Sequence, residues 1–498
     1  MPGGRQNRSR NMSTGHILRG FVPGLKQIPL NTLQKVFCET LHETLHETLY
    51  KTLHKMLHET SHEASGTLNR LEGESDMALQ NVTGAKCTLC GKVIPAGPKI
   101  TTCPHCGGIL DIEYDYDYIR RSIAGSPLTD RDDLTMWRYR EFLPVEGTMK
   151  FPRLRVGGSP LYKADALGAQ LGIRDLWIKD DGQNPTASLK DRASAMAVTK
   201  AVEAGMTTIA CSSTGNAASS LAGNAAAAGL STFIFVPSRA PRGKVAQLMM
   251  FGATVILVEG SYEDTFRISA EAIDRWGWYN RNAAINPYMM EGKKTVSLEI
   301  AEQLSFKMPD YVAVSVGDGC TIAGVWKGFK DLHMAGLIDR LPRLISVQAS
   351  GCCPINTAAA AGTMEWVPQE ENTFADSIAV GVPRNPVKAL RAISESDGVI
   401  VNVSDEEIME AMRMLGRHAG VFAEPAGAAG TAGVKKAVET GLIEKNASVV
   451  SIVTGNGLKD VNNAIRAAGE PMSIKPDMDR LLEAFDSRGL IIPSQKPD

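Results

Sequence analysis

The chain has 498 residues, with 55 acidic and 53 basic side chains and a formal net charge of −2. This balance gives no electrostatic reason to expect nucleic acid or membrane-surface partners. No stretch approaches the 18 uninterrupted apolar residues that a spanning helix needs. The length allows two sizeable domains and a small appendage.

The first 76 residues differ from the rest of the chain. The unit Leu41-His42-Glu43-Thr44 recurs with variation through Thr60, so leucines stand four residues apart. A period of four drifts by about 40° per step around a helix of 3.6 residues per turn, and no clean apolar face results. We therefore expect residues 1–76 to be a disordered low-complexity extension with no part in the chemistry.

Two cysteine pairs follow. Cys87-x2-Cys90 and Cys103-x2-Cys106 are separated by twelve residues, a spacing typical of four thiolates around zinc. Disulfide bonds are the alternative, but the rest of the chain is typical of a cytoplasmic enzyme, where thiols stay reduced. We predict a zinc ribbon over residues 77–118. Four cysteine ligands would close the coordination sphere, so the metal would be structural.

The next informative segment runs from Asn184 to Arg192 and contains Lys190. This lysine lies on a loop that enters an Ala-rich helix (193–198), where its amine could form an imine with an aldehyde cofactor. A lone lysine at this place would more often be a surface residue. Other segments downstream support the cofactor.

Two strand–turn–helix segments come next. The apolar run 208–211 leads to Ser212-Ser213-Thr214-Gly215-Asn216-Ala217 and a second Ala-rich helix, whose first turn could bind a carboxylate. The apolar run 311–316 leads to Gly317-Asp318-Gly319-Cys320-Thr321 and a helix (323–332). That turn predicts a phosphate nest.

The C-terminal part completes the pattern. We expect residues 397–416 to be helical and the turn 424–427 to complete the larger domain, without a role beyond packing and positioning a cofactor ring. The apolar run 449–453 ends at Thr454, whose hydroxyl is available to a ring nitrogen. The alternation of short apolar runs with Ala-rich helices indicates an α/β doubly wound architecture.

Together these segments resemble the fold-type-II pyridoxal-phosphate enzymes, most closely the threonine synthase group, over residues 156–466. The resemblance implies two doubly wound domains of the tryptophan synthase β-like kind, preceded by the zinc ribbon. We assign residues 119–205 and 326–490 to a large domain that binds the cofactor, and residues 206–325 to a smaller domain on the substrate side.

The resemblance also implies roles for individual residues. Lys190 would be the Schiff-base lysine and the general base, Asn216 would meet the 3-hydroxyl of pyridoxal 5′-phosphate, and Thr454 would meet the pyridine nitrogen. Ser213 and Thr214 would contact the amino acid substrate. The 5′-phosphate would be held by Gly317, Asp318, Gly319, Cys320 and Thr321.

One segment departs from the group's pattern, Asn-Ser-x-Asn-Pro-x-Arg-x-Glu-Gly. Here the arginine is replaced by Met289 and the serine by Ala283 or Ala284. Losing a charged contact to a phosphate should cost about 1.5–3 kcal/mol, so the pattern disfavours a phosphorylated substrate. Arg239 or Arg242 could replace the lost arginine, and that alternative stays open.

Three hypotheses result. The first is an acyltransferase similar to the β subunit of 2-amino-4-oxopentanoate thiolase, an enzyme of ornithine degradation. It would use coenzyme A to form alanine and acetyl-CoA, with Met289 against the substrate's methyl ketone and a small α subunit as partner. The second is threonine synthase, a carbon–oxygen lyase acting on O-phosphohomoserine. The third is a ligand-binding descendant without cofactor. In each case we expect an oligomer.

Overall fold

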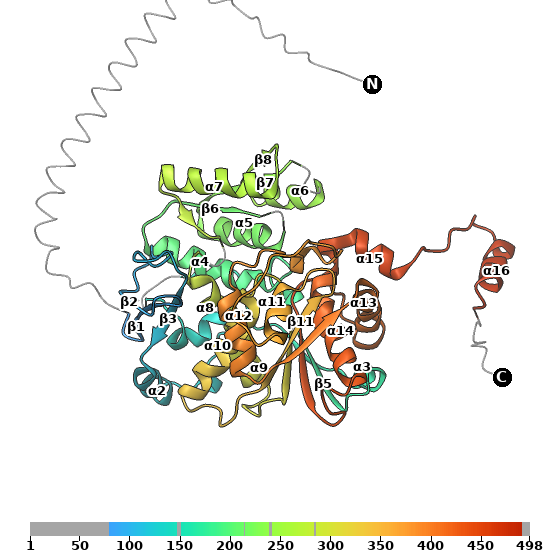
Figure 1. Cartoon of the computed structure of the whole chain (residues 1–498). Helices are drawn as coiled ribbons and strands as arrows, with labels where there is room; N and C mark the ends of the chain where they lie inside the picture. Colours follow the sequence, from blue (N-terminus) through green and yellow to red (C-terminus); the bar gives the residue numbers. More distant parts are fainter. Residues whose placement is uncertain (1–78, 147–150, 214, 239–241, 283–284, 491–498) are drawn as a thin grey trace, which may run out of the picture. The chain divides into compact units, whose positions relative to one another are not determined.

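The computed structural model describes residues 79–146, 151–213, 215–238, 242–282 and 285–490 (Figure 1). They belong to one unit, Ala78–Asp498. The extension predicted for residues 1–76 lies outside the described residues, and every structural statement below concerns the described part alone.

A six-stranded sheet forms the larger layer. Its strand order is β12-β11-β10-β13-β5-β4, and all neighbouring strands are parallel except β4 against β5. Near-continuous apolar runs are typical of parallel strands that are covered on both faces. The strands are β4 (Leu161–Lys163), β5 (Asp175–Asp180), β10 (Tyr311–Ser315), β11 (Arg343–Ala349), β12 (Val399–Val403) and β13 (Ser448–Val453).

Helices cover the large sheet on both faces. Side chains alternate along β10: Val312 and Val314 join one hydrophobic cluster, while Tyr311 and Ala313 join another. The first cluster includes residues of α8 (Tyr288–Lys293), α9 (Thr295–Gln303), α10 (Cys320–Met334), α11 (Pro354–Ala360) and α12 (Pro386–Glu395). The second includes residues of α3 (Asp165–Leu171), α13 (Asp405–Ala419) and α14 (Pro425–Glu439).

A smaller parallel sheet has the strand order β8-β7-β6-β9. Helices α5 and α7 both pack on β6 and β7 (Figure 1). The elements of this layer are β6 (Thr208–Ser212), β7 (Ser231–Pro237), β8 (Thr254–Val258), β9 (Tyr279–Asn280), α4 (Lys190–Glu203), α5 (Asn216–Ala228), α6 (Arg242–Met250) and α7 (Tyr262–Trp276).

An antiparallel ribbon precedes both sheets. Its strands β1 (Val82–Cys87), β2 (Val93–Ile94) and β3 (Leu110–Tyr114) pair in the order β2-β1-β3. The Tyr114 hydroxyl donates to Glu291 at 2.6 Å, which ties the ribbon to α8. The remaining elements are α2 (Tyr116–Gly125), α15 (Val461–Ala468), α16 (Met478–Ser487) and the 3-10 turns η4 (Leu128–Asp130), η5 (Met136–Phe142), η6 (Asp181–Gln183), η7 (Asp376–Ile378) and η8 (Gly457–Asp460).

The α/β architecture agrees with the sequence prediction, but two details differ. Strand β10 lies in the large sheet between β11 and β13, although we had placed residues 206–325 in the smaller domain. Residues 399–403 form β12, although we had expected helix from residue 397; the run Val-Ile-Val-Asn-Val favours a strand and pairs in parallel with β11. Among the described residues, no helix is long and apolar enough to cross a membrane.

Candidate active site

A cavity of about 820 Å3 is lined by residues at the carboxyl ends of β6, β10 and β13. Parallel α/β sheets characteristically bind ligands at this edge. The cavity brings together Lys190, Ser213, Asn216, Thr454 and the whole 317–321 turn, which come from four separate segments. Thr214, also predicted here, lies outside the described residues.

Met289 is not among the residues that line this cavity. Its side chain is 1% exposed and belongs to the hydrophobic cluster between α8 and the neighbouring helices. The structure therefore does not bring Met289 to the place where we expected a substrate methyl group. Ala283, Ala284 and Arg239 lie outside the described residues, and the side chain of Arg242 is not described.

The loop that carries Lys190 is fixed to the end of β13. The Leu189 amide donates to the Thr454 carbonyl at 2.9 Å, and the Asn456 amide donates to the Ala187 carbonyl at 3.0 Å. Ala187 has a φ of 67°, a left-handed conformation that costs energy for a residue with a Cβ. These contacts hold the loop of Lys190 against the segment of Thr454.

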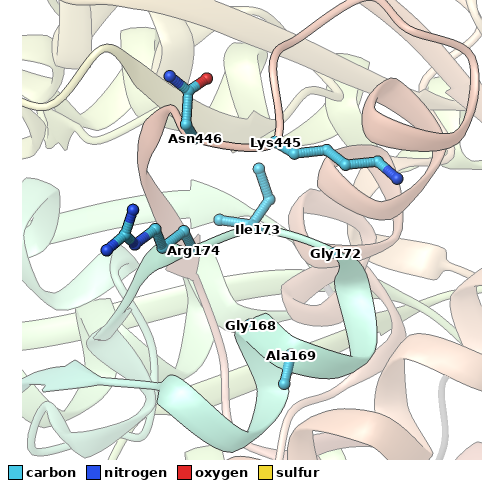
Figure 2. A pocket seen from close by; sticks show the side chains of 7 residues that line it. All are labelled: Gly168, Ala169, Gly172, Ile173, Arg174, Lys445 and Asn446. Atoms are coloured by element: carbon cyan, nitrogen blue, oxygen red, sulfur yellow. The ribbon is translucent and has the colours of Figure 1, made fainter.

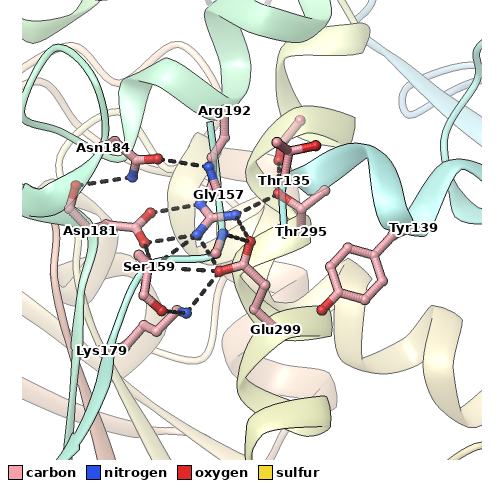
Figure 3. Close-up of polar contacts among 12 residues, drawn as sticks. Thr135, Tyr139, Gly157, Ser159, Lys179, Asp181, Asn184, Arg192, Thr295 and Glu299 are labelled. Carbon is pink, nitrogen blue, oxygen red and sulfur yellow. Dashed lines mark hydrogen bonds and ion pairs between the residues drawn. The ribbon is translucent and has the colours of Figure 1, made fainter. Parts of the chain in front are cut away.

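Arg192 anchors the first turn of α4 from below (Figure 3). Its fully buried guanidinium donates to Asp181 at 2.7 Å and to both carboxylate oxygens of Glu299 at 2.7 Å. The Lys179 ammonium donates to the same Glu299 carboxylate at 2.8 Å. Burial raises the pKa of Glu299, but the charges of Arg192 and Lys179 outweigh it and hold that pKa well below its usual range. The network keeps the helix start, and hence Lys190, in place.

Burial lowers the pKa of Lys190 to about 8, and the positive charges of Lys293 and Arg281 lower it further in the same direction. A lysine amine must be unprotonated to attack a carbonyl carbon. Near neutral pH this environment keeps a much larger fraction of the amine neutral than an ordinary lysine would have. Lys190 is therefore chemically suited to bind an aldehyde.

Asn216 has a buried partner that the sequence did not predict. Its amide nitrogen donates to Glu424 at 2.7 Å, and Glu424 also lines the cavity. Burial raises the pKa of Glu424 to about 7, although the bond from Asn216 acts against the shift. The second hydrogen of the Asn216 amide remains available to a ligand, so Glu424 orients that donor.

The turn after β10 leads directly into the 15-residue helix α10, whose first residue is Cys320. Gly319 has a φ of 87°, and a Cβ there would stand 2.5 Å from the Asn385 carbonyl oxygen. Glycine is thus required for the chain to turn into α10. The Asp318 carboxylate accepts a hydrogen bond from the Arg384 amide at 2.7 Å, which fixes the turn with the helix N-terminus toward the cavity.

Two buried cations that local sequence pattern did not predict also line the cavity. Arg281 follows β9 and is 2% exposed, and its one hydrogen-bond acceptor among the described residues is the Ser194 hydroxyl, at 3.0 and 3.2 Å. Lys293, at the end of α8, is 3% exposed. Neither forms an ion pair within the described part of the chain. Buried charges without partners are strongly destabilising, so this cavity is suited to anions.

Two neutral groups in the cavity also lack a partner among the residues that the structure describes. Within that part of the chain, the Ser212 hydroxyl and the Asn282 amide nitrogen are buried without a hydrogen bond, although the Asn282 oxygen accepts from the Ser212 amide at 3.0 Å. Buried polar atoms are nearly always satisfied in a working state. We expect a ligand or water to satisfy both.

The four ribbon cysteines converge as predicted. All four sulfur atoms lie within 4.8 Å of one another, with 3.4 Å between Cys87 and Cys106 and 3.7 Å between Cys90 and Cys103. A tetrahedral zinc with Zn–S bonds of 2.3 Å sets its sulfurs about 3.8 Å apart. The donor set and spacing therefore fit zinc.

A shallow hollow of about 370 Å3 lies elsewhere, between the end of α3 and the segment before β13 (Figure 2). Arg174, Lys445 and Asn446 line it together with backbone and apolar atoms. It contains none of the predicted site residues, and we assign it no role.

The sequence profile of the family described as pyridoxal-phosphate dependent enzyme matches residues 153–455, well over half of the chain. The chain belongs to this family of enzymes.

Curated relatives narrow the comparison. The chain is 41% identical over 398 residues to a protein named threonine synthase from Methanocaldococcus jannaschii, covering 80% of this chain and 98% of that protein. A protein of the same name from Methanosarcina acetivorans is 40% identical, with the same coverage. A third, from Synechocystis, is 35% identical over 73% of this chain and 94% of the relative.

Solved structures agree on the fold. Escherichia coli diaminopropionate ammonia lyase aligns with a TM-score of 0.55 at 20% identity, over 69% of this chain and 93% of that chain. Maize serine racemase aligns with a TM-score of 0.53 at 23% identity, over 66% and 92%. At these identities the likeness concerns the fold-type-II architecture alone.

The relatives overturn the thiolase hypothesis. They are named threonine synthase, so the prediction of an acyltransferase of ornithine degradation was wrong. The coenzyme A and small α-subunit expectations rested on that hypothesis alone. Its physical premise is also weakened, because the buried Arg281 lines the cavity although we had expected a substrate without a phosphate.

The cavity residues fit pyridoxal phosphate. Lys190, with its lowered pKa, can react with the aldehyde, and the glycine turn at the N-terminus of α10 can bind the phosphate. The buried amide of Asn216 can hydrogen-bond to the ring hydroxyl.

Proposed function

We propose that this chain is a threonine synthase, which converts O-phosphohomoserine and water to threonine and phosphate. The curated relatives support this, since they bear that name and the alignments cover 94–98% of their length. The observation that carries the proposal in the structure is Arg281, a buried guanidinium without an acidic partner in the described residues, lining the same cavity as Lys190. It supplies the phosphate-binding cation that the Met289 position lacks.

When bound, pyridoxal phosphate supplies an electron-withdrawing ring that makes the Cα proton of an attached amino acid acidic. Lys190 would hold the cofactor covalently and, once displaced by substrate, would carry that proton, which its lowered pKa favours. The hydroxyl of Thr454 would face the ring nitrogen, and the Asn216 amide, oriented by Glu424, would face the 3-hydroxyl. The residues of the turn 317–321 would hold the cofactor's phosphate.

The substrate would lie between the N-terminus of α5 and Arg281. Ser213 and the amides before α5 would bind its α-carboxylate, because a helix start favours negative charge. Arg281, Asn282 and Ser212 would bind its phosphate, which would satisfy the two unpartnered polar groups as well. The carboxylate and phosphate ends then fix the substrate at both ends, a geometry that positions Cα near Lys190.

We also infer that Cys87, Cys90, Cys103 and Cys106 hold a structural zinc ion. Four sulfur ligands leave no open coordination position, so the ion would have no catalytic role.

The test is direct. Purified holoenzyme should release phosphate and form threonine from O-phosphohomoserine in equal amounts, and Lys190→Ala should abolish both. Formation of a 2-oxo acid and ammonia from serine or threonine, without phosphate release from O-phosphohomoserine, would assign the chain to another activity of the same family.

A further inference from the structure

Lys293 is a buried lysine whose ammonium has no partner among the described residues. It is 3% exposed and lines the cavity. The next residue, Lys294, differs: it pairs with Glu291 and with Asp331, each at 2.6 Å. Since a buried ammonium without an anion is costly, Lys293 is suited to an anionic ligand.

The place of that anion follows from the packing of α8 on α10. A Cβ added at Gly324 would stand 3.1 Å from the Lys293 Cβ, so the lysine backbone lies against the first turns of α10. The charge of Lys293 also acts on the buried Cys320 thiol, opposing the increase in its pKa that burial causes. Cys320 is the first residue of α10, so the ammonium lies close to that helix N-terminus.

Among the described residues, no carboxylate oxygen lies within 4.0 Å of the Lys293 ammonium. The Asp318 carboxylate acts on the same region from farther away, and it accepts a hydrogen bond from the Arg384 amide. The other charged groups nearby, Lys190 and Arg281, are themselves cationic and act together with Lys293 on the same region. The N-terminus of α10 adds a further positive end.

We propose that Lys293 is the counter-ion of the 5′-phosphate of pyridoxal phosphate. Its ammonium would pair with the phosphate from the end of α8, while the first turn of α10 would bind the phosphate through backbone amides. The helix amides alone supply partial charges, whereas a phosphate ester carries close to two negative charges at neutral pH. The ammonium completes the neutralisation. Gly324 is the packing residue that lets Lys293 approach. This inference depends on the cofactor and is independent of the substrate named above.

A phosphate ester could also come from the substrate, and the experiment separates the two sources. Cofactor-free full-length protein is titrated with pyridoxal phosphate and with pyridoxal, which keeps the aldehyde but lacks the phosphate, and the bond to Lys190 is followed by its visible absorbance. Lys293→Met should weaken the binding of pyridoxal phosphate by roughly 10- to 100-fold. The binding of pyridoxal should weaken much less, because for this ligand the lost charge acts only through the pKa of Lys190. Inorganic phosphate should compete with pyridoxal phosphate in the unaltered protein and lose that effect in Lys293→Met.

Two control variants sharpen the result. Lys293→Arg should recover most of the affinity for pyridoxal phosphate. Lys330→Met removes an exposed lysine of α10 that pairs with Glu395 at 2.7 Å, and it should change the affinity for neither ligand. Equal losses for pyridoxal and pyridoxal phosphate would overturn the proposal. An unchanged cofactor affinity together with a higher KM for O-phosphohomoserine would also overturn it, because Lys293 would then bind the substrate and not the cofactor.

A measurement on the unaltered holoenzyme gives an independent answer if the variants fail to fold. The 31P resonance of the bound cofactor should keep the position of the dianion from pH 6 to 9, because an adjacent ammonium favours the fully ionised ester. A resonance that titrates near pH 6, as a solvated phosphate ester does, would contradict a counter-ion at this place.

Discussion

At the scale of single residues, Arg281 lowers the stability of the fold and supplies a cation for substrate binding. Its guanidinium is buried, and within the described residues its one hydrogen-bond partner is a serine hydroxyl, which destabilises the fold but leaves the cation available to an anionic substrate. Active sites commonly retain such arrangements because function needs them.

We predict that Arg281→Met lowers kcat/KM for O-phosphohomoserine by about 10- to 100-fold, the effect of losing a charged hydrogen bond. The same change should leave the protein without cofactor as stable as before or more stable, because an unpaired buried charge is removed. Urea unfolding and steady-state kinetics measure the two effects. Loss of stability together with unchanged kinetics would show that Arg281 is structural.

Glu424 should make the unfolding free energy of the protein depend on pH. Burial raises its pKa from 4.5 to about 7 in the folded protein. Between these values the folded state binds more protons than the unfolded state, so stability is greatest below pH 4.5 and falls as pH rises toward 7. In the protein freed of cofactor, we expect the unfolding free energy to fall by about 1.4 kcal/mol per pH unit from this group within that window.

Glu424→Gln isolates the contribution, because glutamine keeps the bond to Asn216 without titrating. Urea unfolding at pH 5, 6 and 7 should show a smaller decrease with pH in the variant than in the unaltered protein. Parallel profiles for the two proteins would mean that Glu424 does not titrate there.

Several of these residues could be anticipated from the sequence and others could not. Lys190, Asn216, Thr454 and the 317–321 turn each follow or begin a regular element, so local pattern places them at one edge of a sheet. Arg281 follows a strand of only two residues, and Lys293 and Glu424 lie at the ends of helices without a recognisable motif. Their roles depend on which way a side chain faces after packing. For the same reason, the loss of an arginine at Met289 did not reveal that another cation lines the cavity.

At the scale of elements, the start of α4 is held by a buried charge network. Arg192 bridges Asp181 of η6 and Glu299 of α9, so one side chain joins three segments of the chain (Figure 3). Such a network is costly to assemble but very sensitive to the loss of a member.

We predict that Arg192→Met lowers the unfolding free energy by about 3–5 kcal/mol, because two carboxylates are left buried without this partner. Lys163→Met, which removes an ion pair with the partly exposed Asp175, serves as the matched control and should cost less than about 1 kcal/mol. Chemical denaturation compares the two. Equal, small losses would mean that Lys179 alone can compensate Glu299.

The elements also show where sequence pattern fails. Strands β6, β10 and β13 were placed by their apolar runs, but the sheet to which β10 belongs depends on its pairing with distant segments, one of which, β13, lies over 100 residues away. The short run of β12 was absorbed into a predicted helix because five residues give little periodicity.

At the scale of the whole molecule, the ribbon is tied to the catalytic layers. The Lys388 ammonium of α12 donates to the Leu110 carbonyl and pairs with Asp111, each at 2.7 Å, and Tyr114 donates to Glu291 on α8. Because α8 also carries Lys293, order in the ribbon should support the cavity.

We predict one zinc ion per chain, and removal of the metal by a strong chelator should lower Tm by at least about 4 °C. Cys103→Ser should have the same effect, whereas Cys353→Ser, at a cysteine outside the ribbon, should not. Metal analysis and thermal unfolding decide the matter. Protein that contains no zinc, and whose Tm is unchanged by Cys103→Ser, would refute the structural metal.

The measurement that tests the central proposal most directly is isotope transfer during turnover in water enriched in 18O. A threonine synthase releases phosphate by breaking the carbon–oxygen bond and takes the new hydroxyl from solvent. We therefore predict one labelled oxygen in the threonine hydroxyl and none in the released phosphate. Label in the phosphate with homoserine as product would show simple ester hydrolysis and would contradict the account.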